Sequence, residues 1–122
     1  MALILIIDDE PLTASLCQEI LEQAGYDVLV AHNGHEGLYL FSRTPADLVI
    51  TDVFMPVQDG LEVIMNLRRE KLNVPIIAIT GNAAGHHFLN MANQLGAQHT
   101  MAKPFSATDL VQAVQQQLQG AP

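Results

Sequence analysis

The chain contains little cysteine, little positive charge and few aromatic side chains. Of its 122 residues, one is cysteine, five are lysine or arginine, and 5% are aromatic. Cys17 has no partner for an intrachain disulfide, so we expect a reducing, cytoplasmic compartment. Because 49% of the residues are hydrophobic, we expect a core of Leu, Ile, Val and Ala, as in a compact α/β protein.

The shortage of positive charge argues against a nucleic-acid partner. The formal net charge is −8, and apart from residues 68–71 the basic residues are scattered, so no basic stripe can displace counterions from phosphates.

No apolar run approaches the ~20 residues of a membrane span, and the N-terminus lacks the basic region and cleavage site of a signal peptide. No repeat or linker divides the chain, and residues 1–122 are expected to form one domain.

Short apolar segments alternate with segments of helical spacing along the whole chain. The expected strands cover residues 3–7, 27–31, 48–52, 75–79 and 98–102. A helix is expected after each strand, and the starting signals are Pro11, a capping box of Asn33 and Glu36, Gly60, the segment around Phe88, and Ser106. Right-handed crossovers would place these helices on both faces of a parallel sheet.

The spacing of apolar side chains also suggests which face of each helix is buried. In the first helix Leu12, Leu16, Ile20 and Leu21 recur at helical spacing. In the third helix the expected core face consists of Val63, Ile64 and Leu67. Arg68 is expected to be solvated. Cys17 is expected to be a small buried or half-buried side chain and not a nucleophile.

Four of the expected strands end on side chains that can support chemistry. In chain order these are Asp8 and Asp9, Asp52, Thr80, and Lys103. The carboxyl ends of parallel strands lie at one edge of the sheet, which is where ligands bind in such folds. Taken alone, Asp52 fits equally well as the cap of the next turn. The four strand ends together favour one shared site.

Three carboxylates close together repel one another unless a cation compensates them. All-oxygen ligation favours Mg²⁺ over zinc, which prefers His and Cys. A magnesium ion at this place could bridge to a phosphoryl oxygen. Lys103 would supply a second positive charge, and the Thr80 hydroxyl would donate a hydrogen bond. Such groups are typical of sites for phosphoryl transfer. Carboxylate nucleophiles that form aspartyl phosphates are an established category in this kind of chemistry.

Four motifs occur in order at the ends of the expected strands: the acidic pair Asp8-Asp9, the D-x-x-M-P-x-x-x-G segment at residues 52–60, Thr80-Gly81, and Lys103-Pro104-Phe105. With these motifs the sequence resembles a two-component response regulator receiver domain over residues 3–118. The resemblance implies a flavodoxin-like α/β fold with strand order 2-1-3-4-5 and helices on both faces of the sheet. It also implies a cis peptide bond before Pro104.

The resemblance implies a metal site and a phosphoacceptor. Asp52 would take a phosphoryl group from a phosphohistidine of a sensor histidine kinase or a histidine phosphotransfer protein. Mg²⁺ would be bound directly by Asp9, Asp52 and the backbone carbonyl of Phe54. Asp8 would act on the metal through a water molecule.

The resemblance also implies a signalling switch that assists its own phosphorylation and dephosphorylation without being a turnover enzyme. Thr80 would be the switch hydroxyl, and Lys103 would contact the phosphate. A downstream protein effector or a fused output domain would read the change through the fourth helix, the fifth strand and the fifth helix. No contact with nucleic acid or membrane is expected of the domain itself.

One position departs from the family pattern. Three residues before Lys103, where the family has a switch aromatic residue, this chain has Thr100. Threonine cannot fill the pocket of a rotating Tyr or Phe, so we expect signalling to rely on residues 81–85 and the fourth helix. His99 is expected to point to the other face of its strand.

Other functional classes fit the sequence less well. A scaffold of the same fold that is never phosphorylated has no need for this charge cluster. A flavin-binding protein would need a Ser/Thr/Gly-rich phosphate loop at residues 8–11, where acidic side chains stand instead, and a P-loop nucleotidase would need the absent G-x-x-x-x-G-K. The five histidines lack metal-ligand spacing and are expected to be solvated or capping residues.

Overall fold

The computed structural model describes residues 2–53, 60–70, 73–81 and 85–119, without the side chains of 86–89. Ten elements alternate in this part of the chain: β1 (Leu3–Ile7), α1 (Pro11–Gln23), β2 (Asp27–Ala31), α2 (Gly34–Arg43), β3 (Leu48–Asp52), α3 (Gly60–Arg69), β4 (Ile76–Thr80), α4 (Gly85–Leu95), β5 (His99–Ala102) and α5 (Ala107–Gln119). None of these helices combines the length and the hydropathy that crossing a lipid bilayer requires.

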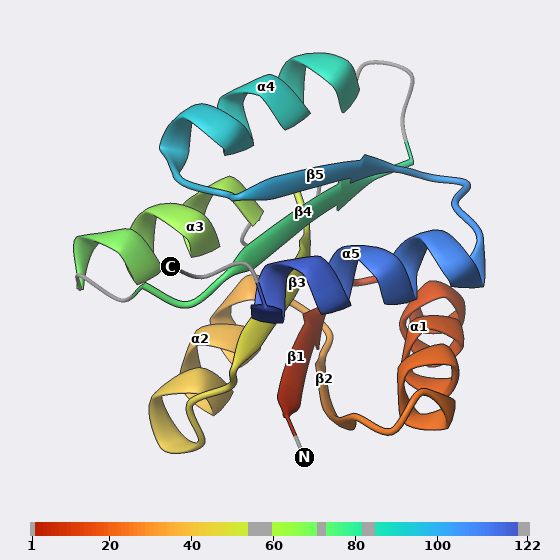
Figure 1. Ribbon diagram of the computed structural model, residues 1–122. Helices are drawn as coiled ribbons and strands as arrows, with labels where there is room; N and C mark the ends of the chain where they lie inside the picture. Colours follow the sequence, from red (N-terminus) through yellow and green to blue (C-terminus); the bar gives the residue numbers. More distant parts are fainter. Residues whose placement is uncertain (1, 54–59, 71–72, 82–84, 120–122) are drawn as a thin grey trace.

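All five strands form one parallel sheet in the order β2-β1-β3-β4-β5. The expected flavodoxin-like topology is therefore confirmed (Figure 1). Strand limits also agree with expectation to within one residue, since β4 covers Ile76–Thr80 and β5 covers His99–Ala102. Every residue of β3 and β4 is buried, which explains why central parallel strands read as continuous apolar runs.

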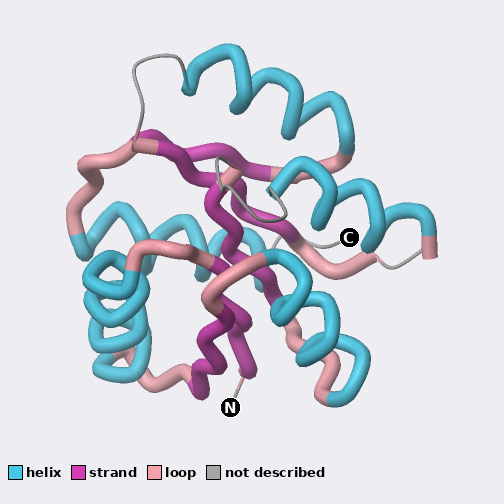
Figure 2. The backbone as a smooth tube through the Cα atoms, turned by 180° about the vertical axis from the view of Figure 1, so that it is seen from behind, coloured by secondary structure: helices cyan, strands magenta, loops and turns pink. Residues whose placement is uncertain are grey.

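The helices cover both faces of the sheet. One hydrophobic cluster joins the sheet to α2, α3 and α4 through side chains that include Phe41, Ile64 and Ala92. The second cluster joins the opposite face to α1 and α5 through side chains that include Leu21 and Leu110. Figures 1 and 2 show these two layers from opposite sides. The protein is thus a three-layer α/β/α structure in which the carboxyl ends of the parallel strands lie at one edge of the sheet.

The capping box that begins α2 is present with a small variation. The Asn33 side chain accepts a hydrogen bond from the Glu36 N–H at 2.8 Å. The Glu36 carboxylate accepts from the N–H of His32 at 3.0 Å, one residue before the cap. Both backbone donors at this helix start are satisfied, as a capping box requires.

The predicted helix α1 is confirmed, and Leu21 is buried as its spacing suggested, but two other members of the expected apolar face are exposed. Ala14, Cys17 and Leu21 are buried, whereas Leu12 is 81% exposed and Leu16 is 57% exposed. Two apolar stripes run along this helix, and either satisfies a period of 3.6 residues. Periodicity therefore identifies the helix without selecting the stripe that faces the sheet.

Cys17 lies in the core between the sheet and α1, as predicted, and is 2% exposed. Burial, followed by the negative charge of Asp8, raises the pKa of its thiol to about 11, against a smaller opposing effect of Lys103. The thiolate is the reactive form of cysteine. At neutral pH this side chain therefore behaves as a small hydrophobic group.

Arg68 is not the solvated residue that the helical pattern suggested. Its guanidinium is half-buried and donates to the carbonyl of Gly96 through Nη2 at 2.9 Å and Nε at 3.2 Å. Nη2 also donates to Gln98 Oε1 at 2.8 Å, and the same oxygen accepts from the Ile76 N–H at 2.8 Å. Arg68 therefore ties the end of α3 to the end of α4 and the start of β4.

Gly96 is placed where this contact requires glycine. Its φ of +126° is in a region that side chains disfavour, and a Cβ would lie 2.9 Å from Arg68 Cγ. The glycine thus ends α4 and leaves room for the arginine at the same time.

We expect Arg68→Met to lower the free energy of unfolding by about 1–3 kcal/mol, because the Gly96 carbonyl and the Gln98 amide lose a charged donor in a half-buried place. Arg69→Met is the matched control, since Arg69 is exposed and bonds only within its own helix in the described contacts. It should cost less than about 0.5 kcal/mol. Urea denaturation measures both values, and equal losses would contradict the role of Arg68.

The pKa of Cys17 predicts a pH-dependent loss of stability. Between pH 9 and about 11 the unfolded thiol is ionised while the folded thiol keeps its proton, so the free energy of unfolding falls as pH rises. The fall should be about 2–3 kcal/mol larger in the wild type than in Cys17→Ala, in which this group is absent and all others are common. Parallel stability curves of the two proteins across this range would refute the shift.

Candidate functional site

Two of the predicted aspartates follow β1. Asp8 is 1% exposed and Asp9 is exposed. The backbone N–H of Asp8 donates to the carbonyl of Ala31 in β2 at 3.0 Å, and Asp8 Oδ1 accepts from the N–H of Glu10 at 2.9 Å. The strand pairing and this tight turn fix the Asp8 carboxylate at the edge of the sheet.

Asp52 ends β3, directly beside β1 in the sheet. It is 6% exposed, and its position in the ladder pairs it with Ile79 of β4. The next residue, Val53, still donates to the Ile79 carbonyl at 2.9 Å. Because pairing continues past Asp52, its backbone is held rigidly in the sheet.

Gly60 explains how α3 can begin so close to Asp52. A Cβ at this position would collide with the Asp52 carbonyl oxygen and lie 2.7 Å from Val53 Cα. The sequence marks Gly60 as a helix start, but the close approach depends on a contact that only the fold creates.

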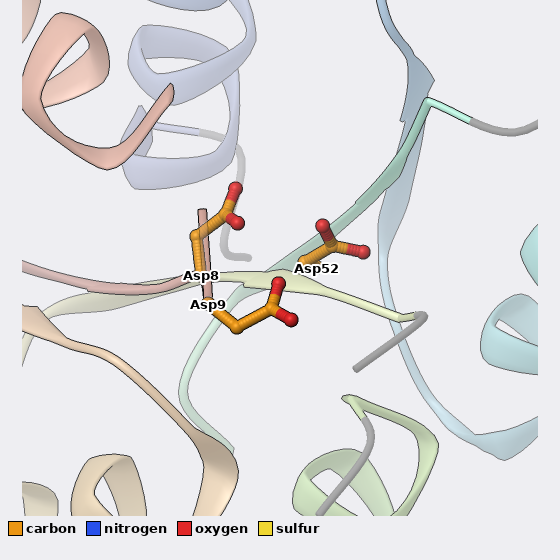
Figure 3. Close-up of side chains that lie close together, drawn as sticks. All are labelled: Asp8, Asp9 and Asp52. Carbon is orange, nitrogen blue, oxygen red and sulfur yellow. The ribbon is translucent and has the colours of Figure 1, made fainter. Parts of the chain in front are cut away.

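The structure brings the three predicted carboxylates together. Carboxylate oxygens of Asp8, Asp9 and Asp52 all lie within 4.8 Å of one another. Figure 3 shows the side chains projecting from the neighbouring ends of β1 and β3 into the same space. In the described part of the chain this is the one group of three or more potential metal ligands.

Lys103 joins two of these carboxylates. Its Nζ lies 3.2 Å from Asp8 Oδ2 and 3.2 Å from Asp52 Oδ2, and the side chain is 19% exposed. Burial acts to lower the pKa of Lys103, but attraction to Asp52 and then to Asp8 outweighs it, so the pKa is raised. The ammonium is therefore fully charged at neutral pH.

The backbone around Lys103 is fixed by β4. Its N–H donates to the Thr80 carbonyl at 2.7 Å, and the expected cis bond to Pro104 is present. A Cβ on Gly81 would lie 3.1 Å from Lys103 Cδ, so the lysine stem passes closely over this glycine. Thr80 itself is 2% exposed and lies one residue beyond the partner of Asp52 in the register.

The charges of the cluster suit a divalent cation. Three carboxylates and one ammonium carry a net charge of −2 (three negative charges, one positive). Repulsion of this size calls for a cation or a shifted pKa. The donor atoms are all carboxylate oxygens, which fits Mg²⁺ and disfavours metals that prefer nitrogen or sulfur.

Some sequence-based expectations fall outside the described residues. They concern the Phe54 carbonyl as a metal ligand and residues 82–84 of the segment expected to move. His32 and His35 are exposed, as expected of solvated histidines. His99 lines a groove between β5 and α5, whereas Thr100 pairs with Ala78 on the face covered by α4, so the two side chains do point oppositely.

One charged residue at the site was given no role from the sequence. Glu10 Oε1 lies 4.0 Å from Lys103 Nζ, and the Glu10 side chain is 61% exposed. Its position directly after Asp8-Asp9 was the available signal. The lysine that brings it into the site comes from the other end of the chain.

Comparisons with known proteins agree with this geometry. The family model described as the response regulator receiver domain matches residues 4–115. Among curated proteins, the alkaline phosphatase synthesis transcriptional regulatory protein PhoP of Bacillus subtilis is 40% identical over 88% of this chain and 44% of its own length. The response regulator SaeR of Staphylococcus aureus is 34% identical over 91% of this chain and 48% of its own. The chain thus spans less than half the length of these relatives.

Solved structures show the same fold over almost the whole chain. The Francisella response regulator 1452 receiver domain superposes with a TM-score of 0.90 at 26% identity, covering 98% of both chains. A CheY-like receiver domain protein from Methanospirillum hungatei gives a TM-score of 0.91 at 26% identity, covering 98% of this chain and 95% of its own. The match of fold, sequence and strand-end residues leads to one conclusion. This chain belongs to the response regulator receiver domain family of two-component systems.

Proposed function

We propose that residues 1–122 form a single receiver domain that accepts a phosphoryl group on Asp52. The observation that carries this proposal is the Lys103 ammonium lying 3.2 Å from both Asp8 and Asp52 beside the exposed Asp9. A buried carboxylate with a cation and further acidic groups at a solvent-facing edge is suited to phosphoryl transfer, where positioning and charge neutralisation dominate.

The donor in this proposal is the phosphohistidine of a sensor histidine kinase or of a histidine phosphotransfer protein. A carboxylate oxygen of Asp52 forms a bond to phosphorus while the phosphorus–nitrogen bond of the donor breaks. The electron pair of that bond returns to the imidazole, which takes up a proton. Lys103 then neutralises part of the added charge, and the Thr80 hydroxyl at the end of β4 is proposed to bond a phosphoryl oxygen.

Asp9, Asp52 and the Phe54 carbonyl would hold Mg²⁺, and Asp8 would orient a water molecule on it. When bound, the ion neutralises charge on the transferring phosphoryl group. The fit rests on the all-oxygen donor set and on the net charge of −2 carried by three carboxylates and one ammonium.

The output surface is proposed to be the face formed by α4, β5 and α5. Of 13 acidic and five basic residues, only Lys103 and Asp109 lie beyond residue 84, so this face is nearly uncharged on a strongly acidic protein. A groove of ≈350 Å³ between β5 and α5 makes this surface concave there. A protein effector or a fused output domain could dock there without like-charge repulsion.

Thr100 bears on how a structural change caused by phosphorylation is transmitted to the surface of α4, β5 and α5. Its side chain is half-buried on the face of the sheet covered by α4, and it cannot repeat the rotation of a large aromatic ring. We propose instead that α4 and the segment leading to it move when Thr80 bonds the phosphoryl group. Structures with and without a phosphoryl mimic test this proposal, and repacking confined to Thr100 would contradict it.

We expect the full chain to gain one phosphoryl group when incubated with Mg²⁺ and acetyl phosphate, and Asp52→Ala to gain none. Intact-mass spectrometry at neutral pH measures the added mass directly. Asp27→Ala is the matched control, because it removes an exposed carboxylate at the start of β2. Labelling that persists in Asp52→Ala would refute the assignment, and a wild type that is never labelled would favour an unphosphorylated scaffold.

A second expectation concerns the metal. Asp9→Asn should weaken Mg²⁺ binding by roughly tenfold or more, because it removes a charged ligand from the cluster. Isothermal titration calorimetry of the metal alone measures this without any phosphodonor. Glu19→Gln, an exposed change of the same charge in the middle of α1, should leave the affinity within about twofold, a bound set by the screening of distant surface charges. Equal affinities of wild type and Asp9→Asn would rule out this ligand set.

A further inference from the structure

Glu10 occupies a distinct place at the site. It is the residue that precedes α1, and its carboxylate accepts a hydrogen bond from the Thr13 hydroxyl. Its Oε1 lies 4.0 Å from Lys103 Nζ, with a side chain 61% exposed against 1% for Asp8 and 8% for Asp52. Among the three carboxylates around this ammonium, Glu10 is therefore the one on the solvent side.

We propose that Glu10 determines which phosphodonors react at Asp52 by disfavouring small dianionic ones. This inference rests on the proposed function and adds a specificity-determining residue to it. A small donor reaching Asp52 from solvent must place its negative oxygens near Lys103, whose solvent side faces the Glu10 carboxylate. A donor with two negative charges is repelled more strongly than one with a single negative charge.

The contact is not explained by a purely structural role. Glu10 occupies the N-cap position of α1, but its side chain makes no capping hydrogen bond to the backbone N–H groups of that helix. An exposed ion pair at 4.0 Å contributes little to stability. The remaining structural effects are the exposed hydrogen bond from the Thr13 hydroxyl and a favourable negative charge near a helix N-terminus. Neither of them depends on the donor.

The effect of the Glu10 charge is local and differs from that of the overall negative charge of the protein. The chain carries a formal net charge of −8, but distant surface charges are screened over roughly 8 Å at physiological ionic strength. Glu10 acts inside this distance from Lys103, and the acidic residues of the middle of α1 do not contact the cluster in the described interactions. The acidic residues in the middle of α1 are therefore not expected to discriminate between donors as Glu10 does.

The test compares two donors of different charge on the full chain with saturating Mg²⁺. Acetyl phosphate is a dianion at neutral pH, and phosphoramidate carries one net negative charge. With either donor the Asp52 oxygen forms the bond to phosphorus, and the leaving group takes the electron pair of the broken bond. Acetate leaves from acetyl phosphate, and ammonia leaves from phosphoramidate, whose nitrogen is already protonated in the singly negative form. The second-order rate constant of phosphorylation is measured for each donor by intact mass.

Glu10→Gln should increase the rate constant with acetyl phosphate by roughly threefold and that with phosphoramidate by less than about twofold, at low ionic strength. The difference should shrink when salt is added. Glu10→Asp keeps the charge and should keep the wild-type ratio of the two rate constants. Glu19→Gln makes the same charge change on α1 and should also leave the ratio unchanged.

If the ratio of the two rate constants is the same in Glu10→Gln as in the wild type, the inference is overturned. Equal acceleration with both donors is one such case, and it would point to an effect on the nucleophile or the metal. Equal changes in Glu19→Gln and Glu10→Gln would show a non-local charge effect and would also overturn the inference. A wild type that neither donor labels would instead contradict the proposed function. The two failures are thus distinguished by whether the wild type is labelled at all.

Discussion

The site depends on a single ammonium group held between two buried carboxylates. Lys103 contacts Asp8 and Asp52, which lie 95 and 51 residues away in the sequence. Two buried carboxylates without this partner would carry uncompensated charge, which is strongly destabilising in a protein interior. The same pair of contacts ties the ends of β1, β3 and β5 together. The same two contacts therefore neutralise the charge of the site and hold the strand ends together.

The parallel sheet makes this arrangement possible. A parallel sheet places the carboxyl ends of all its strands at one edge, and hydrophobic clusters on both faces keep those ends in register. The pairing of Val53 beyond Asp52 and of Lys103 with Thr80 extends the rigid part past the reactive groups. A site built on such strand ends is more precisely positioned than one on free loops.

Much of this could be predicted from the sequence, because it follows from local pattern and one topological rule. Strands that end on Asp8, Asp52 and Lys103 place these residues at one edge once the sheet is parallel, whereas the strand order that makes them neighbours came from the family resemblance. What failed depended on long-range contacts. Arg68 looks solvated on its own helix, and only the fold brings the Gly96 carbonyl to it from 28 residues away. The buried stripe of α1 was equally undetermined, since its choice depends on the sheet and α5.

The proposed phosphorylation would change how Lys103 is shared. An unmodified Asp52 offers it one negative charge, whereas a phosphoryl group offers nearly two, so Lys103 should move its contacts away from Asp8 and Glu10. Its backbone is bonded to Thr80, and any shift is therefore felt at the paired ends of β4 and β5. These strand ends adjoin the nearly uncharged face of α4, β5 and α5. Since Thr100 has no aromatic ring to relay the change, a displacement of this backbone would accompany the proposed movement of α4 and carry the change from the charge cluster toward a partner.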